Sequence, residues 1–176
     1  MWFFKPSEVA KIGMKIEENG LAFYRALADK TGESEAQALF NFMAGEEAQH
    51  YKIFKALSDK LEGYDVPTGE EDDYEEYMRY LANNSVFATD ADPVALAKGI
   101  NSVNEAIDLA VGFEKDSVLF YLQFKKMVPA EEKFEIDAII EEEQKHIYRL
   151  LTVKKIYGTS REEFYIPKGD LGDAEI

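Results

Sequence analysis

Two Glu-Glu-x-x-His segments carry the side chains of this sequence that are best suited to chemistry, and they hold both of its histidines. In each segment the second glutamate stands three residues before the histidine, which gives the pairs Glu47 with His50 and Glu143 with His146. Residues three apart on a helix lie on one face, one turn from each other. Each pair therefore offers a carboxylate and an imidazole to the same point, and both groups are metal ligands.

Two further glutamates stand in a repeated context. Residues 16–24 align with residues 113–121, which matches Glu17 with Glu114 and places Phe-Tyr at the same distance after both. The offset between matched residues is 97 there (114 − 17) and 96 between the two Glu-Glu-x-x-His segments (143 − 47). This repeat predicts two copies of one helical hairpin that face each other about a pseudo-twofold axis.

All of these residues stand on apolar stripes with helical spacing. Four helices would therefore each point a carboxylate toward one axis, and two of them would add an imidazole. Buried carboxylates stay ionised only when paired, so four of them require protons or cations. Two divalent cations would balance them, and a site of oxygen and imidazole donors suits iron or manganese. The predicted metal ligands are Glu17, Glu47, His50, Glu114, Glu143 and His146.

The neighbours of these ligands are interpreted from their place on the stripes. Tyr24 and Tyr121 share the face of the two lone glutamates and are either core aromatics or hydrogen-bond donors that orient a bridging carboxylate. Gly13 and Gly20 lie inside a predicted helix, where glycine costs about 1 kcal/mol relative to alanine. Room for metal ions, oxygen ligands or a close helix crossing would explain them. The glutamates beside the proposed ligands are interpreted as surface residues: Glu18, Glu46 and Glu142.

Four long segments have the apolar period of amphipathic helices and predict an all-α fold. Short links make each successive pair an antiparallel hairpin, so we expect a four-helix bundle of two hairpins joined by a long crossover. Pro129 favours the start of the last helix and Gly158 its end. Two capping boxes mark helix starts: Ser34 with Gln37, and Ser102 with Glu105. The four helices are predicted over residues 6–30, 33–61, 103–127 and 129–157.

Residues 62–102 form the predicted crossover. It begins with an acidic run over residues 63–76, which is interpreted as solvated surface. A helical piece over residues 77–83 follows, and then a short helix that Asp92-Pro93 would start and Gly99 would end.

Length and composition set the class of protein. The 176 residues suffice for one domain, which we expect over residues 1–158, with a tail over residues 159–176 that lies along the surface or reaches a neighbouring subunit. There is no cysteine, which excludes disulfides, thiolate metal sites and a cysteine nucleophile and fits a reducing cytoplasm. A net charge of −15 disfavours nucleic acid and anionic membranes as partners. No apolar run approaches the roughly 20 residues of a membrane span, so we expect a soluble cytoplasmic protein.

The predicted ligands and their spacing resemble those of a known family. One glutamate each from the first and third helices, with Glu-x-x-His from the second and fourth, resembles the ligand set of the ferritin-like di-iron carboxylate superfamily. Phe-Tyr after the lone glutamates is most similar to its rubrerythrin branch. The resemblance covers the four helices and implies two metal ions per chain, which we expect to be iron, with manganese as the alternative.

 By that resemblance Glu47 and Glu143 bridge the two ions, Glu17 and Glu114 are terminal ligands, and His50 and His146 bind one ion each.

Two departures from the family pattern bear on activity. Rubrerythrins proper carry a small Cys₄ iron module, rubredoxin, and this chain has no cysteine, so its electrons would come from a separate donor protein. Rubrerythrins also place a second carboxylate one turn after the ligand of the third helix, where it exchanges with a histidine as iron changes oxidation state. Ser117 stands at that position here, and Asp116 points away by about 100°.

Two functions follow from the resemblance. The first is an oxidoreductase of the peroxidase or ferroxidase type, in which a di-iron pair reduces hydrogen peroxide or dioxygen with Fe(II) as the electron source. The alternative is an iron-binding or ferroxidase protein that handles or buffers iron without an organic substrate. A purely structural bundle would leave the converging carboxylates unexplained. We expect a homodimer in either case.

Overall fold

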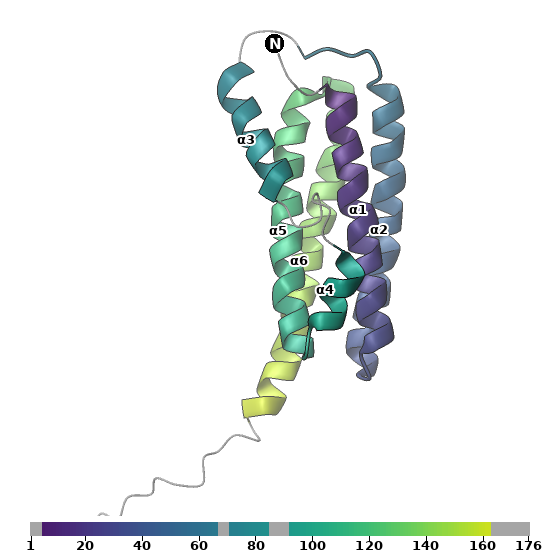
Figure 1. Cartoon of the computed structure of the whole chain (residues 1–176), viewed down its shortest axis with the longest axis vertical. Coiled ribbons are helices and arrows are strands. Elements are labelled where there is room, and N and C mark those ends of the chain that lie inside the picture. The colour runs from purple at the N-terminus through teal and green to yellow at the C-terminus, as the bar shows by residue number, and fades with distance from the viewer. Residues whose placement is uncertain (1–4, 67–70, 85–91, 163–176) are drawn as a thin grey trace, which may run out of the picture.

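The computed structural model describes residues 5–66, 71–84 and 92–162 (Figure 1). Within these residues the chain is all-α, and its four long helices form a bundle, as the sequence predicts. Two shorter helices belong to the crossover, and a 3₁₀ turn precedes the last helix. The long helices are α1 (Pro6–Lys30), α2 (Ser34–Lys60), α5 (Val103–Met127) and α6 (Lys133–Glu162). The short elements are α3 (Glu71–Asn84), α4 (Pro93–Gly99) and η2 (Ala130–Glu132).

The bundle consists of two antiparallel hairpins, α1 with α2 and α5 with α6 (Figure 1). The crossover helices lie on its outside: α3 lies along α5, and α4 lies against α1. Lys30, in the last turn of α1, fixes α4 because its Nζ donates to the carbonyl oxygens of Lys98, at 2.6 Å, and of Ile100. The crossover thus leaves the interior of the bundle to the four long helices.

Local hydrogen bonds set several helix starts as predicted. The Ser102 hydroxyl accepts the N–H of Glu105 at 3.2 Å and caps α5. The Glu105 carboxylate accepts the N–H of Asn101 at 2.8 Å, one residue before the partner that a capping box would use. In α4, Asp92 Oδ1 accepts the N–H of Val94 at 2.9 Å. Both caps satisfy backbone donors that have no partner inside the helix.

Three predictions about element boundaries are wrong. Ser34 is the first residue of α2 and does not cap it; Gln37 instead donates to the Ala28 carbonyl oxygen at 3.0 Å, which ties α2 to the end of α1. Helix α6 continues through Gly158 to Glu162, because one helical glycine costs only about 1 kcal/mol. The predicted start of the tail at residue 159 therefore falls inside α6, and residues 163–176 lie outside the described residues.

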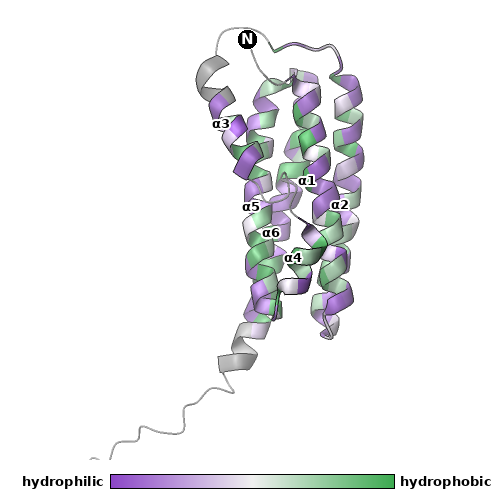
Figure 2. Ribbon diagram, viewed as in Figure 1, coloured by the Kyte–Doolittle hydropathy of each residue, from purple (hydrophilic) through white to green (hydrophobic). Residues whose placement is uncertain are grey.

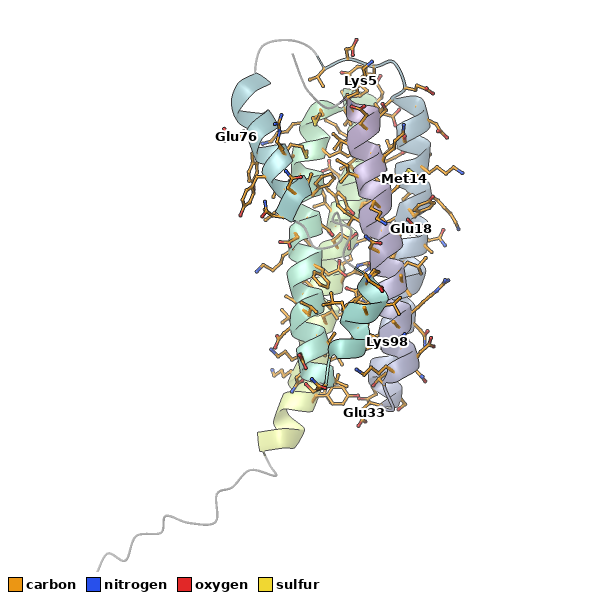
Figure 3. The ribbon with its side chains drawn as sticks, in the orientation of Figure 1. Lys5, Met14, Glu18, Glu33, Glu76 and Lys98 are labelled. Atoms are coloured by element: carbon orange, nitrogen blue, oxygen red, sulfur yellow. The ribbon has the colours of Figure 1, made fainter. Side chains whose placement is uncertain are left out.

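The third correction concerns the acidic run. Helix α3 begins at Glu71, inside the acidic run and before the predicted start of the helical piece at residue 77, and it extends past the predicted end to Asn84. Glu76, the last residue of the run, is exposed on this helix (Figure 3). Buried Met78 supplies the inner face. Residues 67–70, also in the run, lie outside the described residues.

The core lies between the two hairpins, and buried apolar side chains surround a polar centre of buried glutamates and histidines. Figure 2 shows polar and apolar residues alternating along the long helices. Phe23 of α1 meets Phe113 of α5 edge to face, with ring centroids 5.2 Å apart. Phe54 of α2 meets Tyr121 of α5 at 4.7 Å. Burial of each such side chain stabilises the fold by roughly 1.5–3 kcal/mol, which holds the polar centre in place. In the part of the chain that the structure describes, no helix is long and apolar enough to cross a membrane.

Candidate metal centre

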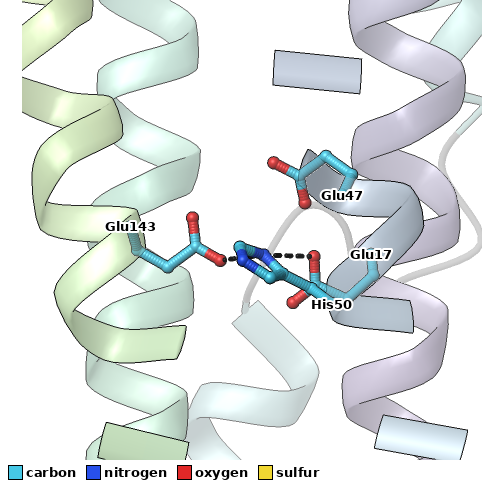
Figure 4. A group of neighbouring side chains, drawn as sticks. All are labelled: Glu17, Glu47, His50 and Glu143. Carbon is cyan, nitrogen blue, oxygen red and sulfur yellow. Dashed lines mark ion pairs between the residues drawn. The ribbon is translucent and has the colours of Figure 1, made fainter. Parts of the chain in front are cut away.

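The six predicted metal ligands come together in the middle of the bundle, and all six are buried. They form two overlapping groups in which the potential ligand atoms lie within 4.8 Å of one another. Glu47 and Glu143 belong to both groups. Figure 4 shows the first group, to which α1, α2 and α6 contribute. The groups are Glu17, Glu47, His50 and Glu143, and Glu47, Glu114, Glu143 and His146.

The two histidines point the same nitrogen into the cluster. His50 Nδ1 lies 2.9 Å from Glu143 Oε1 and 3.6 Å from Glu17 Oε2 (Figure 4). His146 Nδ1 lies 2.8 Å from the other oxygen of Glu143 and 3.8 Å from Glu114 Oε2. The two rings are 5.7 Å apart and nearly parallel, at 29°. The distances of 3.6 and 3.8 Å join equivalent pairs and agree with the pseudo-twofold arrangement that the internal repeat predicts. The two shorter contacts both go to Glu143 and depart from that symmetry, which would pair one of them with Glu47.

The two tyrosines connect the hairpins on opposite sides of the pseudo-twofold axis. The Tyr24 hydroxyl of α1 donates to Glu114 Oε1 of α5, and the Tyr121 hydroxyl of α5 donates to Glu17 Oε1 of α1. Both rings are fully buried. Each tyrosine is therefore a core aromatic and also a hydrogen-bond donor that fixes one oxygen of a carboxylate from the opposite hairpin.

Two glycines of α1 allow α2 to approach closely. A Cβ atom at Gly20 would lie 3.1 Å from Glu47 Oε2, and one at Gly13 would lie 2.6 Å from Cδ1 of Phe54. Of the explanations that the sequence leaves open, room for an oxygen ligand fits Gly20, and a close helix crossing fits Gly13.

Burial makes two of the carboxylates hard to ionise. The pKa of Glu114 is raised to about 8, first by burial and then by the charge of Glu143. The pKa of Glu47 is raised well above its ordinary value by burial and by the charges of Glu17 and Glu143. Both side chains therefore hold a proton at neutral pH in the metal-free protein.

Glu143 behaves in the opposite way because two histidines face it. Burial alone would raise its pKa, but hydrogen bonds from His146 and His50 outweigh burial and lower it. Burial alone would lower the pKa values of the histidines, but their carboxylate partners raise the pKa of His50 to about 12 and that of His146 to about 9. Glu143 is thus the ionised partner of two protonated imidazoles.

The atoms left without partners fit a cation. Glu17 Oε2 and Glu47 Oε1 are buried and have no hydrogen-bond partner among the described residues. An unpaired buried carboxylate oxygen costs free energy, and a metal ion would remove that cost. Carboxylate oxygens with one imidazole for each position form the hard donor set that iron and manganese accept.

Sequence reasoning missed one contact of this centre. Glu142, which is interpreted from the sequence as a surface residue, also contacts the cluster: Glu142 Oε2 lies 2.8 Å from His50 Nε2. The side chain is 42% exposed, so it reaches from the surface to the outer edge of the imidazole. Glu18, by contrast, is exposed as predicted (Figure 3). The position of Glu142 directly before a ligand was visible in the sequence, but its partner on the facing helix was not.

A cavity of about 430 Å³ opens at one end of the bundle. The last turn of α1, the start of α5 and Phe40 of α2 line it. The Phe40 ring stacks on Tyr24, with centroids 6.4 Å apart at 20°. One aromatic ring thus separates the cavity from the tyrosine that donates to Glu114.

The fold and the cluster define a class of protein: a ferritin-like four-helix bundle with a carboxylate and histidine cluster in its core. The family model for rubrerythrin matches residues 8–154, and the chain belongs to the rubrerythrin family. A crystal structure from Thermotoga maritima, described as a ferritin-like diiron-carboxylate protein, has the same fold, with a TM-score of 0.60 and 23% identity. The alignment covers 88% of this chain and 97% of that one. A search of curated proteins finds no match.

Proposed function

We propose that the chain is a non-haem di-iron protein that reduces hydrogen peroxide or dioxygen with electrons from Fe(II). The observation that carries this proposal is the pair of overlapping ligand groups that share Glu47 and Glu143. Glu17 and His50 would complete one metal position, and Glu114 and His146 the other. The sharing supports bridging roles for Glu47 and Glu143, and the hard donor set supports iron, with manganese as the alternative.

For this reaction the protein has only to hold the metal ions in position and to exclude water. Two bound ferrous ions would supply the two electrons that convert one hydrogen peroxide and two protons into two water molecules. Tyr24 and Tyr121 hold Glu114 and Glu17 in place from the opposite hairpin. All six ligand side chains are buried, which favours a small oxidant over an organic substrate. A separate donor protein would return the electrons, since the chain has no cysteine for a rubredoxin module.

Iron handling is the second candidate, and Ser117 is the observation that favours it. Ser117 is buried one turn after Glu114, where the family resemblance implies a carboxylate. A hydroxyl offers no negative charge to a ferric ion. A site of this kind would oxidise or buffer iron more readily than it would turn over with peroxide.

Anaerobic titration with Fe(II), followed by metal analysis and absorbance, tests the site. We expect about two ions per chain, and saturation at none or one would exclude a dinuclear centre. Adding hydrogen peroxide in measured amounts then tests the reaction: one peroxide should oxidise two ferrous ions. Repeated turnover with an added reductant would support the oxidoreductase, whereas a single oxidation followed by release of ferric iron would support iron handling.

A further inference from the structure

The two halves of the cluster differ at the outer nitrogen of each histidine. His50 Nε2 lies 2.8 Å from Glu142 Oε2. His146 Nε2 is buried and has no hydrogen-bond partner among the residues that the structure describes. The repeat matches Glu142 with Glu46, at the 96-residue offset (142 − 46). The same residue type therefore stands in both halves, but only one copy binds a histidine.

Bulk beside the histidines accounts for this difference. Phe42 lies edge-on to the His146 ring, with centroids 6.2 Å apart at 87°. The guanidinium carbon of Arg149 lies 4.1 Å from the centre of the Phe42 ring and covers it. The repeat matches Phe42 with Ala138. By the repeat, the position equivalent to the aromatic ring beside His146 carries only a methyl group in the other half. From this match we infer that His50 keeps room for the Glu142 carboxylate.

This contact bears on metal binding because the other nitrogen faces the cluster. In both histidines Nδ1 points at the carboxylates, so Nε2 carries the proton when Nδ1 binds a metal ion. A carboxylate that accepts this proton fixes the tautomer and the ring orientation and makes the imidazole a stronger donor. His50 has such an acceptor. For His146 the buried N–H has no acceptor among the described residues, which is unfavourable.

We propose that Glu142 is a positioning residue that makes the metal position of His50 the tighter of the two, so that it fills before the position of His146. The inference rests on the proposed function, since it requires that the cluster binds metal ions. It adds the order in which the two metal positions fill, and it attributes that order to the hydrogen bond between Glu142 and His50, which lies outside the set of metal ligands.

Titration of the metal-free full-length chain with Co²⁺, followed by calorimetry, tests the proposal. Crystals grown with one equivalent of Co²⁺ should show anomalous density at the position of His50. Glu142→Ala should weaken the tighter binding step by about 10- to 100-fold, and Glu142→Gln, which keeps a neutral acceptor, should recover part of the loss. Glu46→Ala removes the same charge at the matched position and should leave both steps unchanged. The melting temperature of each metal-free variant shows whether it folds like the wild type.

The outcomes separate this inference from the function on which it rests. Equal occupancy of the two positions at one equivalent, or the same loss in Glu46→Ala and Glu142→Ala, would overturn the role of Glu142 and leave a dinuclear site intact. No binding of Co²⁺ at any concentration would overturn both.

Discussion

Metal loading should release protons, and the protonation of the metal-free cluster sets their number. At pH 7 His50 and His146 are charged, since their pKa values are raised to about 12 and about 9. Glu114 is neutral because its pKa is raised to about 8, and Glu47 is neutral because its pKa is raised well above the ordinary value. Ligands bind metal ions in their unprotonated forms, so one proton from each side chain gives a release of about four.

The release should depend on pH in a defined direction. Above pH 9, Glu114 and His146 are already deprotonated in the metal-free protein. The release should therefore fall by about two protons between pH 7 and pH 10. His50 keeps its proton throughout this range because its pKa is raised to about 12.

Calorimetric titration with Mn²⁺ measures this release directly. When the titration is repeated at one pH in buffers of different ionisation enthalpy, the slope of the apparent binding enthalpy against that enthalpy equals the number of protons released. Glu47→Gln carries no titratable proton there and should reduce the number by about one. A slope near zero for the wild type would refute the reasoning, because it would mean that the carboxylates and imidazoles are already unprotonated and do not lie together as described.

Three further predictions concern single substitutions. In the metal-free protein Glu143→Gln should lower the free energy of unfolding by roughly 3–5 kcal/mol, because it removes the charge that two buried imidazoles face. Glu47→Gln should leave the free energy of unfolding unchanged or raise it. Denaturant unfolding of the two variants measures the difference. Gly13→Ala should be less stable than the control Gly112→Ala by roughly 1–3 kcal/mol. The methyl group of Gly13→Ala would lie 2.6 Å from a buried phenylalanine ring, whereas the methyl group of the control would have no atom within 4 Å. Equal melting temperatures of the two variants would contradict this prediction. Ser117→Glu should speed oxidation by peroxide by about 10- to 100-fold, and stopped-flow absorbance of the Fe(II)-loaded protein measures the rate.

Helical periodicity and the internal repeat predict much of the fold. The bounds of α1 and α5 agree with the predicted ranges, because one apolar face and a cap determine each helix locally. The repeat also predicts that Tyr24 and Tyr121 stand at equivalent positions, and their hydroxyls do make equivalent contacts, each to a glutamate of the opposite hairpin. The sequence did not indicate which glutamate each would reach. Such symmetry is visible in a sequence because equivalent residues keep the same spacing.

Contacts between different helices could not be predicted in the same way. Helical spacing shows which side of α6 carries Glu142, but it does not show that His50 of α2 lies within reach. The same limit explains Gln37, whose amide binds the end of α1 in place of its own helix start. Gly158 is predicted to end the last helix, but a helix tolerates one glycine at small cost, and α6 continues past it. In each case the neighbouring element decides among conformations that the local sequence allows.

The charges of the cluster explain how the bundle can fold with and without metal ions. In the metal-free protein four protons reside on Glu47, Glu114, His50 and His146. Two divalent ions would bring the same positive charge that those four protons carry, so the net charge of the buried site is the same in both states. The bundle therefore does not need metal to avoid uncompensated charge in its core, unlike small metal-binding domains that unfold without it. Metal should still stabilise it, because any ligand that binds only the native state does so by mass action.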